Sequence, residues 1–303
     1  MTRISSGSAG NFFPDDNALP TDNDRLMTSL VSKFAKRQKF DSELEMARSV
    51  QERIFPAVRP AITGLDYFAD WRPASGVGGD YIDYFEMNGG NLGLAVGDVS
   101  GKGVPAALLT SSLHGLIRAL RFAWTSSLKV LMRTIDKLFT EVSPDNCYAS
   151  LFVGEYDPAT GRLHYVNAGH EPPFVLRKSG GHFQTVFLES GGPVIGMLRD
   201  SAFREGVVSL YPHDILVAYT DGLCETTNQS GEEWGWARFQ ETVESCADQT
   251  ARDIVEGVLK SSEAFAAGAM QHDDVTLWVG RVQDAVARNP RRQLESVAEP
   301  VAA

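Results

Sequence analysis

The stretch VGGDYIDYFEMNGGNLGLAVGDVSGKG, residues 77–103, places three aspartates among glycines and apolar residues: Asp80, Asp83 and Asp98. Taking a carboxylate out of water costs free energy, so this setting needs a reason. Asp and Gly are favoured in tight turns, and turn formation is one explanation. The other explanation is that a cation lies between the carboxylates. The stretch alone leaves both open.

The bulk composition excludes several classes of protein. The formal net charge of -11 argues against a nucleic-acid-binding protein, because phosphate-backbone binding requires a basic surface. No apolar run approaches the length of a membrane span, and the N-terminus lacks the apolar core of a signal peptide. Cys147, Cys224 and Cys246 are widely spaced, which favours neither a disulfide framework nor a thiolate zinc site. We therefore expect a reduced, cytoplasmic protein without nucleic-acid or membrane partners.

The two ends of the chain differ from its middle. Residues 1–24 are rich in Ser, Gly, Asn, Asp and Pro, and this composition predicts disorder. Residues 283–303 have the composition of a flexible tail. The segment between them carries the periodic apolar patterns of folded structure.

Residues 25–58 are predicted to form a helical linker or regulatory segment. Its clearest part is DSELEMARSVQERIF, which Pro56 ends. Apolar residues recur there at helical spacing and form a narrow stripe: Leu44, Ala47 and Ile54. Such a stripe fits docking on the chain's own domain and equally fits pairing with a second helix. The sequence leaves these alternatives open.

Strand patterns dominate from Ile62 onward. CYASLFVGEYDPATGRLHYVNAGH is typical of two strands joined by a turn at DPATG, and FVLRKSGGHFQTVFL repeats this design around SGG. Two helical blocks follow different groups of strands, one beginning near Pro105 and one covering about residues 236–267. Hairpins in series and helices in blocks predict an α+β fold with layered antiparallel sheets. The same order argues against a doubly wound nucleotide-binding fold.

Four short segments place aspartates next to predicted strands: GGDYID, VGDVSGKG, YTDG and HDDVT. Each one alone is explained by a turn. Together they would bring carboxylates into one cluster wherever the strand ends converge, and clustered carboxylates need cations to neutralise them. Oxygen ligands favour magnesium, manganese or calcium, and the spacing of a calcium-binding loop is absent. Two such ions could activate a water and clamp a phosphoryl group.

Seven segments occur in the order of a known family: ARSVQERIFP, GGDYID, GDVSGKGVPAAL, NAGHEPP, GGPVIGM, YTDGLCE and HDDVTL. In these segments the chain resembles the SpoIIE/RsbU-type branch of the metal-dependent (PPM, type 2C) serine/threonine protein phosphatases. The resemblance runs from about Gln51 to Val282. It implies a phosphatase domain over residues 59–282 with an α-β-β-α sandwich, in which two antiparallel sheets are flanked by helices.

The same resemblance implies two Mn²⁺ or Mg²⁺ ions and a set of ligands. Asp98 would bridge both ions, and the backbone carbonyl of Val99 would complete one site. Asp80, Asp221 and Asp273 would each bind one ion. These four aspartates would be catalytic through a metal-bound water.

Other polar residues near these segments have less specific signals. Asp83 and Asp274 are candidates for supporting the ligands from behind, and Asp274 would orient its loop. Arg72 and Lys102 are candidates for contact with the substrate phosphate. His170 in NAGHEPP has two interpretations, a general acid or a member of a structural hydrogen-bond network.

The resemblance implies a phosphatase whose substrate is a phosphorylated STAS-type anti-sigma-factor antagonist. Two alternatives remain: a catalytically idle signalling module with this fold, and a phosphatase of small phosphorylated metabolites. The helix before the domain is a candidate for regulation, through an activating partner or through self-association.

Overall fold

The computed structural model describes residues 22–284 except for positions 57, 122–126 and 199. Its chain divides into two compact units, with the border between Glu45 and Met46. The border lies inside one continuous helix, α1 (Asp22–Ile54). Most of the segment expected to be disordered, and most of the expected tail, lie outside the described residues. Residues 22–24, however, already belong to α1.

The first unit is described by the N-terminal part of α1, up to Glu45. Its large apolar side chains are exposed to solvent: Leu26, Met27, Leu30, Val31, Phe34 and Phe40. The first five fall within one broad face at 3.6 residues per turn.

The end of α1 belongs to the second unit. Gln51 is only 3% exposed, and the rings of Phe55 and Trp71 lie 4.3 Å apart between their centroids. The last turns of the helix are therefore part of the folded domain. The second unit begins at Met46, ahead of the phosphatase domain expected over residues 59–282.

The second unit contains two sheets. Five strands form the first sheet, antiparallel throughout, in the order β1 (Leu65–Arg72), β11 (Val275–Val282), β10 (Ile215–Tyr219), β6 (Phe174–Ser179) and β7 (His182–Phe187). The last strand of the chain, β11, thus lies between β1 and β10. The predicted hairpin around SGG joins β6 to β7.

The second sheet has the order β2 (Asp80–Glu86), β3 (Leu92–Val99), β4 (Ala149–Asp157), β5 (Arg162–Ala168) and β8 (Gly191–Gly192). The short β9 (Gly206–Ser209) also pairs with β5, and β8 runs parallel to β5. A 3-10 turn, Asn88–Gly90, connects β2 to β3. The predicted turn at DPATG joins β4 to β5 in an antiparallel hairpin.

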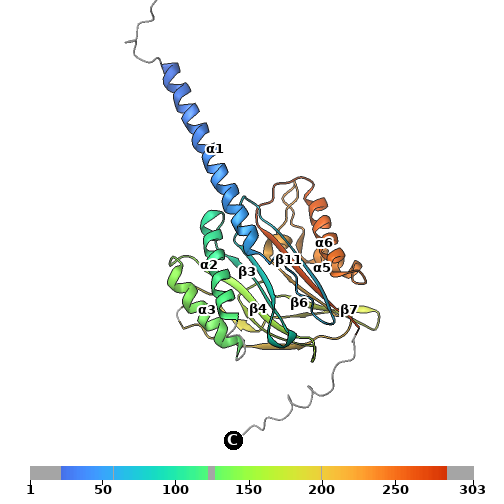
Figure 1. Cartoon of the computed structure of the whole chain (residues 1–303). Coiled ribbons are helices and arrows are strands. Elements are labelled where there is room, and N and C mark those ends of the chain that lie inside the picture. Colours follow the sequence, from blue (N-terminus) through green and yellow to red (C-terminus); the bar gives the residue numbers. More distant parts are fainter. Residues whose placement is uncertain (1–21, 57, 122–126, 199, 285–303) are drawn as a thin grey trace, which may run out of the picture. The chain divides into compact units, whose positions relative to one another are not determined.

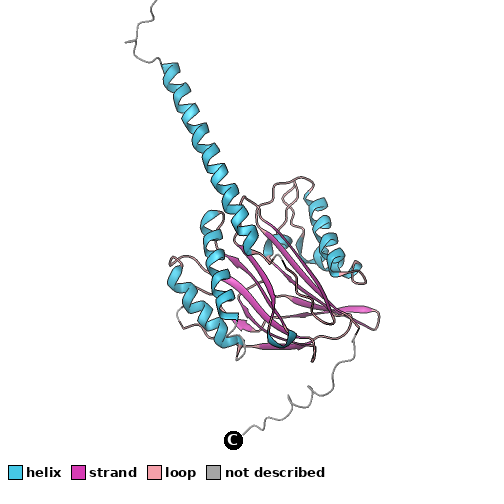
Figure 2. Ribbon diagram, in the orientation of Figure 1, coloured by secondary structure: helices cyan, strands magenta, loops and turns pink. Residues whose placement is uncertain are grey.

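Helices cover the outer face of each sheet (Figures 1 and 2). The second sheet packs against α2 (Val104–Leu120) and α3 (Leu128–Val142), and the first packs against α5 (Gly235–Ser245) and α6 (Ala251–Ala266). The short α4 (Asp221–Cys224) follows β10 directly. This arrangement confirms the predicted α-β-β-α sandwich.

Three apolar cores follow from the layers. The core between the sheets contains large rings such as those of Tyr67, Phe152 and Trp278. Each outer face forms a further core with its pair of helices. None of the helices in the described part of the chain combines the length and apolar character needed to cross a bilayer.

Candidate active site

The aspartates predicted at strand ends converge at one edge of the sandwich. Asp80 at the start of β2 lies opposite Asp98 at the end of β3 in the strand register. Asp221 begins α4 immediately after β10, and Asp273 precedes β11, the neighbour of β10. Asp98, Asp221 and Asp273 line a common cavity of about 330 Å³, called here the acidic pocket.

Burial, together with repulsion from neighbouring carboxylates, raises the pKa values of Asp98 and Asp80. Burial raises the pKa of Asp98 to about 7, and the carboxylates of Asp221, Asp273 and Asp274 contribute to this increase. Burial and the Asp98 carboxylate also raise the pKa of Asp80 well above its ordinary value. The groups are close enough to oppose one another's ionisation, and a cation would relieve this cost.

Two buried threonines hold one oxygen of Asp80. The hydroxyls of Thr220 and Thr276 donate to Asp80 Oδ2 at 2.8 and 2.6 Å. The amide of Thr276 donates to Thr220 Oγ1 at 2.9 Å, which directs the Thr220 hydroxyl proton toward the carboxylate. Sequence reasoning missed both residues, although hydroxyl side chains stand beside the aspartates in YTDG and HDDVT.

A glycine leaves open space at the end of β3. A Cβ on Gly79 would lie 2.8 Å from the carbonyl oxygen of Val99 and 3.2 Å from Asp98 Oδ1. A larger residue would therefore crowd two oxygens that face the same point. This opening is compatible with a bound cation.

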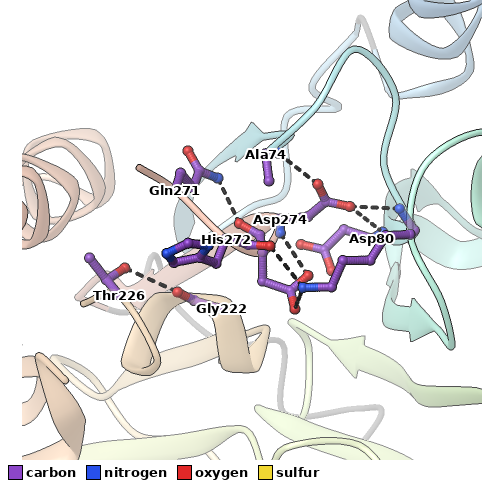
Figure 3. A network of polar contacts seen from close by, with 10 residues as sticks. Ala74, Asp80, Gly222, Thr226, Gln271, His272 and Asp274 are labelled. Carbon is purple, nitrogen blue, oxygen red and sulfur yellow. Dashed lines mark hydrogen bonds and ion pairs between the residues drawn. The ribbon is translucent and has the colours of Figure 1, made fainter. Parts of the chain in front are cut away.

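Asp274 holds the loop that leads into β2 (Figure 3). Its Oδ1 accepts from the amide of Ala74 at 2.8 Å, and its Oδ2 accepts from the amide of Gly79 at 2.6 Å. The backbone of Asp274 also packs closely on α4, where a Cβ on Gly222 would lie 2.1 Å from the Asp274 carbonyl oxygen. Asp274 thus ties the segments of Asp80 and Asp221 together.

The two predicted phosphate-contact residues have protein partners. Lys102 Nζ lies 2.7 Å from Asp273 Oδ2 and donates to the carbonyl oxygen of His272 at 2.8 Å. Lys102 lines the acidic pocket. Arg72 forms ion pairs with Asp70 and Glu263 and lines a neighbouring cavity instead.

The interpretation of Asp83 as support for the ligands is wrong. Alternation along β2 directs Asp83 toward α2, where the guanidinium of Arg118 donates to both of its oxygens at 2.5 Å. Tyr81 OH also donates to Asp83, at 3.2 Å. Because Asp80 and Asp83 are three residues apart on one strand, their side chains lie on opposite faces of the sheet.

His170 lines the acidic pocket but is 5% exposed. Its Nδ1 lies 2.8 Å from Ser150 Oγ, and Asn167 Oδ1 accepts from its backbone amide at 2.8 Å. Burial lowers the pKa of His170 to about 4, so the ring is neutral near pH 7. These contacts favour the structural interpretation, since a general acid needs a proton to give.

Gln51 is a third residue that sequence reasoning did not single out. Its side-chain amide donates to the carbonyl oxygen of Gly78 at 2.7 Å and accepts from the Gly78 amide at 3.0 Å. The end of α1 is therefore hydrogen-bonded to the backbone of Gly78, two residues before Asp80. No periodicity in the sequence marks such a contact, because Gln51 interrupts the apolar stripe.

The donor set fits hard divalent cations, because it consists of carboxylates and a backbone carbonyl. Within the described residues, no group of three or more Asp, Glu, His or Cys side chains is already arranged to hold a metal ion. The carboxylates therefore line an open pocket and do not form a complete set of metal ligands.

Comparison with known proteins agrees with this geometry. Residues 88–283 match the family model described as Stage II sporulation protein E (SpoIIE). The chain is 29% identical over 262 residues to protein IcfG of Synechocystis sp., covering 78% of this chain and 40% of IcfG. It is 27% identical over 248 residues to phosphoserine phosphatase RsbU of Bacillus subtilis, covering 81% of this chain and 71% of RsbU. The chain thus spans less than half of IcfG.

Solved structures share the fold. The SiaA-PP2C domain of Pseudomonas aeruginosa superposes with a TM-score of 0.72 at 23% identity, covering 82% of this chain and 98% of that domain. The catalytic domain of the serine threonine protein phosphatase PstP, solved with 2 manganese ions, gives a TM-score of 0.53 at 14% identity, with 73% and 99% coverage. This chain belongs to the SpoIIE family, in the RsbU-like branch of the metal-dependent serine/threonine protein phosphatases.

Proposed function

We propose that this protein is a metal-dependent phosphatase that removes phosphate from serine or threonine of a regulatory protein, with a STAS-type anti-sigma-factor antagonist as the substrate class. The observation that carries the proposal is the convergence of Asp98, Asp221 and Asp273 in one pocket, where burial, with a contribution from the neighbouring carboxylates, raises the pKa of Asp98 to about 7. The similarity to the phosphoserine phosphatase RsbU supports the reaction class.

The proposed ligands are Asp80, Asp98, the Val99 carbonyl, Asp221 and Asp273. Two Mn²⁺ or Mg²⁺ ions, when bound, would supply the charge that activates water and neutralises the phosphoryl oxygens. Gly79 keeps the space in front of Val99 and Asp98 open.

The threonine contacts give Asp80 a defined orientation. Because Oδ2 accepts from Thr220 and Thr276, Oδ1 is the oxygen left for an ion. Hydrogen bonds to a metal-binding carboxylate fix the orientation of its side chain and change its basicity.

The two alternative functions have different consequences. An idle module would be expected to have lost part of the carboxylate set, and all four aspartates are present. A metabolite phosphatase would use the same ions and is separated from a protein phosphatase only by substrate. The proposal includes the cytoplasmic location expected from the sequence. The absence of disulfide bonds among Cys147, Cys224 and Cys246 in the structure is compatible with it.

We expect the full chain with Mn²⁺ to dephosphorylate a phosphoserine STAS protein with a kcat/KM at least about 100-fold above that for p-nitrophenyl phosphate. A protein substrate adds contacts outside the reacting phosphate, and that binding energy favours the transition state. Phosphate release from both substrates would be measured side by side. Equal kcat/KM values would contradict protein specificity, and no release from either would favour the idle module.

We also propose that the first unit regulates activity by self-association or by binding an activating partner. Of the residues predicted for this contact, Ala47 and Ile54 are partly buried in the second unit. The apolar residues upstream are more accessible, with Leu30 40% and Phe34 70% exposed. The proposed contact surface is therefore the face that contains Leu26, Leu30 and Phe34.

The double variant Leu30→Glu/Phe34→Glu is expected to weaken self-association and to remove any increase of turnover with protein concentration. Charges on both helices of a pair would repel and would be costly to bury. Sedimentation velocity and turnover over a range of concentrations would measure both effects. The control Ser32→Glu/Ala35→Glu adds the same charge on another face of the helix. Identical behaviour of the two double variants would show that this face has no part in association.

A further inference from the structure

A second cavity, called here the side cavity, adjoins the acidic pocket. It has a volume of about 360 Å³ and lies between α4, α6 and the loop before β11. Lys102 and Asp273 line both cavities. Figure 3 shows Thr226, Gln271 and His272, three residues of its wall, beside Gly222 and Asp274. The two cavities are therefore neighbours, with Lys102 and Asp273 between them.

Part of the wall of the side cavity is apolar, beside charged residues such as Arg72 and Glu263. Leu259 and Val275 form buried parts of its wall, and Ala266 at the end of α6 and Ala269 in the following loop also line it. Met270 stands at its rim and is 78% exposed. A flexible thioether beside an apolar hollow adapts to side chains of different shapes.

Two hydroxyls within the wall, those of Thr226 and Ser262, have protein partners. Thr226 Oγ1 donates to the carbonyl oxygen of Gly222 at 3.0 Å, and Ser262 Oγ donates to Thr226 Oγ1 at 3.2 Å. The hydrogen-bonding capacity of these two side chains is thus directed into the protein. Their contacts favour an apolar occupant over a polar one.

Hydrogen bonds and an ion pair hold the wall in shape. The Gln271 side chain donates to the carbonyl oxygens of Arg72 at 3.0 Å and Asp273 at 2.8 Å. An ion pair joins Arg72 to Glu263 of α6. At the other end of the loop, Gln229 donates to the carbonyl oxygen of Ala267 at 3.0 Å. The cavity is therefore largely preformed, which lowers the entropic cost of binding.

We infer that the side cavity receives an apolar side chain of the phosphoprotein substrate, from a residue close in sequence to the phosphorylated serine or threonine. This inference rests on the proposed phosphatase function. The shared wall residues place the two cavities side by side, and an extended chain advances only about 3.3–3.6 Å per residue. The volume is near the lower limit of small-ligand sites, which suits a single side chain better than a folded segment.

The test uses two variants of the full chain and a set of phosphoserine peptides. Ala266→Phe fills the side cavity from the end of α6, and Met270→Glu places a charge at its rim. Each peptide of the set carries either Leu or Asp at one position flanking the phosphoserine. The control Val130→Glu adds a charge at an exposed position of α3, on the other side of the sandwich.

We expect the wild-type protein to prefer Leu over Asp at one flanking position by about 10-fold or more in kcat/KM, the usual scale for an apolar pocket. Both cavity variants should lose this preference through KM, with p-nitrophenyl phosphate turnover within about twofold of wild type. Val130→Glu should keep the preference. The small ester reports on the reacting centre alone, since it lacks flanking residues.

Three results would overturn the inference: no preference in the wild-type protein, an unchanged preference in both variants, or an equal loss of peptide and small-ester turnover in both. In each case the wild-type protein still releases phosphate from the small ester, so the proposed reaction stands. Failure of the reaction itself has a different signature, because the wild-type protein would then hydrolyse neither substrate.

Discussion

Asp98→Asn is expected to lower kcat for a phosphoprotein by at least about 100-fold at saturating Mn²⁺. Asp98 lies at the centre of the acidic pocket, where Asp221, Asp273 and Asp274 all influence its ionisation. A neutral amide would not balance two divalent cations, and charge stabilisation by such ions contributes several kcal/mol to catalysis. Phosphate release at increasing Mn²⁺ concentrations measures the effect and separates weak metal binding from slow turnover.

The melting temperature of Asp98→Asn in EDTA provides an independent measurement. Removal of one carboxylate relieves repulsion in the acidic pocket, so the metal-free variant should melt at or above the temperature of the wild-type protein. Asp83→Asn is the control, since Asp83 is more deeply buried than Asp98 and pairs with Arg118 on the other face of β2. The control should lose stability and keep the kcat of its folded fraction. Near wild-type turnover of Asp98→Asn would contradict its proposed role as a metal ligand.

Chelation of divalent cations is expected to abolish activity, and Mn²⁺ or Mg²⁺ should restore it. The same ions should stabilise the fold by mass action, by about 2.7 kcal/mol at a concentration 100 times the dissociation constant. For a domain of this size, such a gain corresponds to a rise in melting temperature of about 5–10 °C. Calorimetry with and without Mn²⁺ measures this shift, and phosphate release with EDTA measures the loss of activity.

The stabilisation by Mn²⁺ should increase with pH. The pKa of Asp98 is about 7 in the folded protein, above the value of about 3.9 for an unfolded chain. Folding without metal is therefore favoured by protonation of Asp98. This contribution is complete below about pH 4 and is lost as the pH rises through 7. Mn²⁺ replaces the proton, so its effect on the melting temperature should be larger at pH 8 than at pH 5. A shift that is the same at both values, or activity that survives chelation, would contradict the acidic metal site.

Local patterns of the sequence predicted much of the fold. The turns at DPATG and SGG give the hairpins β4–β5 and β6–β7, because Gly and Asp in short loops define where a strand reverses. The aspartates at strand ends are also readable, since the strands themselves are strongly apolar. The position of β11 between β1 and β10 was not readable, because pairing between distant segments leaves no local signature.

The site was less predictable than the fold for identifiable reasons. The alternation of side chains along β2 already predicts that Asp83 and Asp80 lie on opposite faces of the sheet. The roles of Thr220, Thr276 and Gln51 depend on groups brought together only by tertiary structure. The ion pair of Lys102 with Asp273 likewise depends on tertiary structure, because the two residues are 171 positions apart in the sequence.

The place of β11 in the first sheet has a consequence for how the protein folds. The segment from β2 to β5 is continuous in sequence, contains α2 and α3, and forms most of one sheet with its covering helices. Such local contacts form early. The first sheet, by contrast, lacks the strand between β1 and β10 until β11 is available, and Ala74 meets Asp274 across 200 residues.

Closing so long a loop is slow, and it comes last during synthesis from the N-terminus. The arrival of β11 also brings Asp273 and Asp274 to the acidic pocket. The carboxylates therefore come together in the final step of folding, when the packing of both sheets is available to offset their repulsion. Nascent chains that have not reached β11 keep β1 and β10 as open sheet edges, and this is the stage at which the protein is most exposed to aggregation.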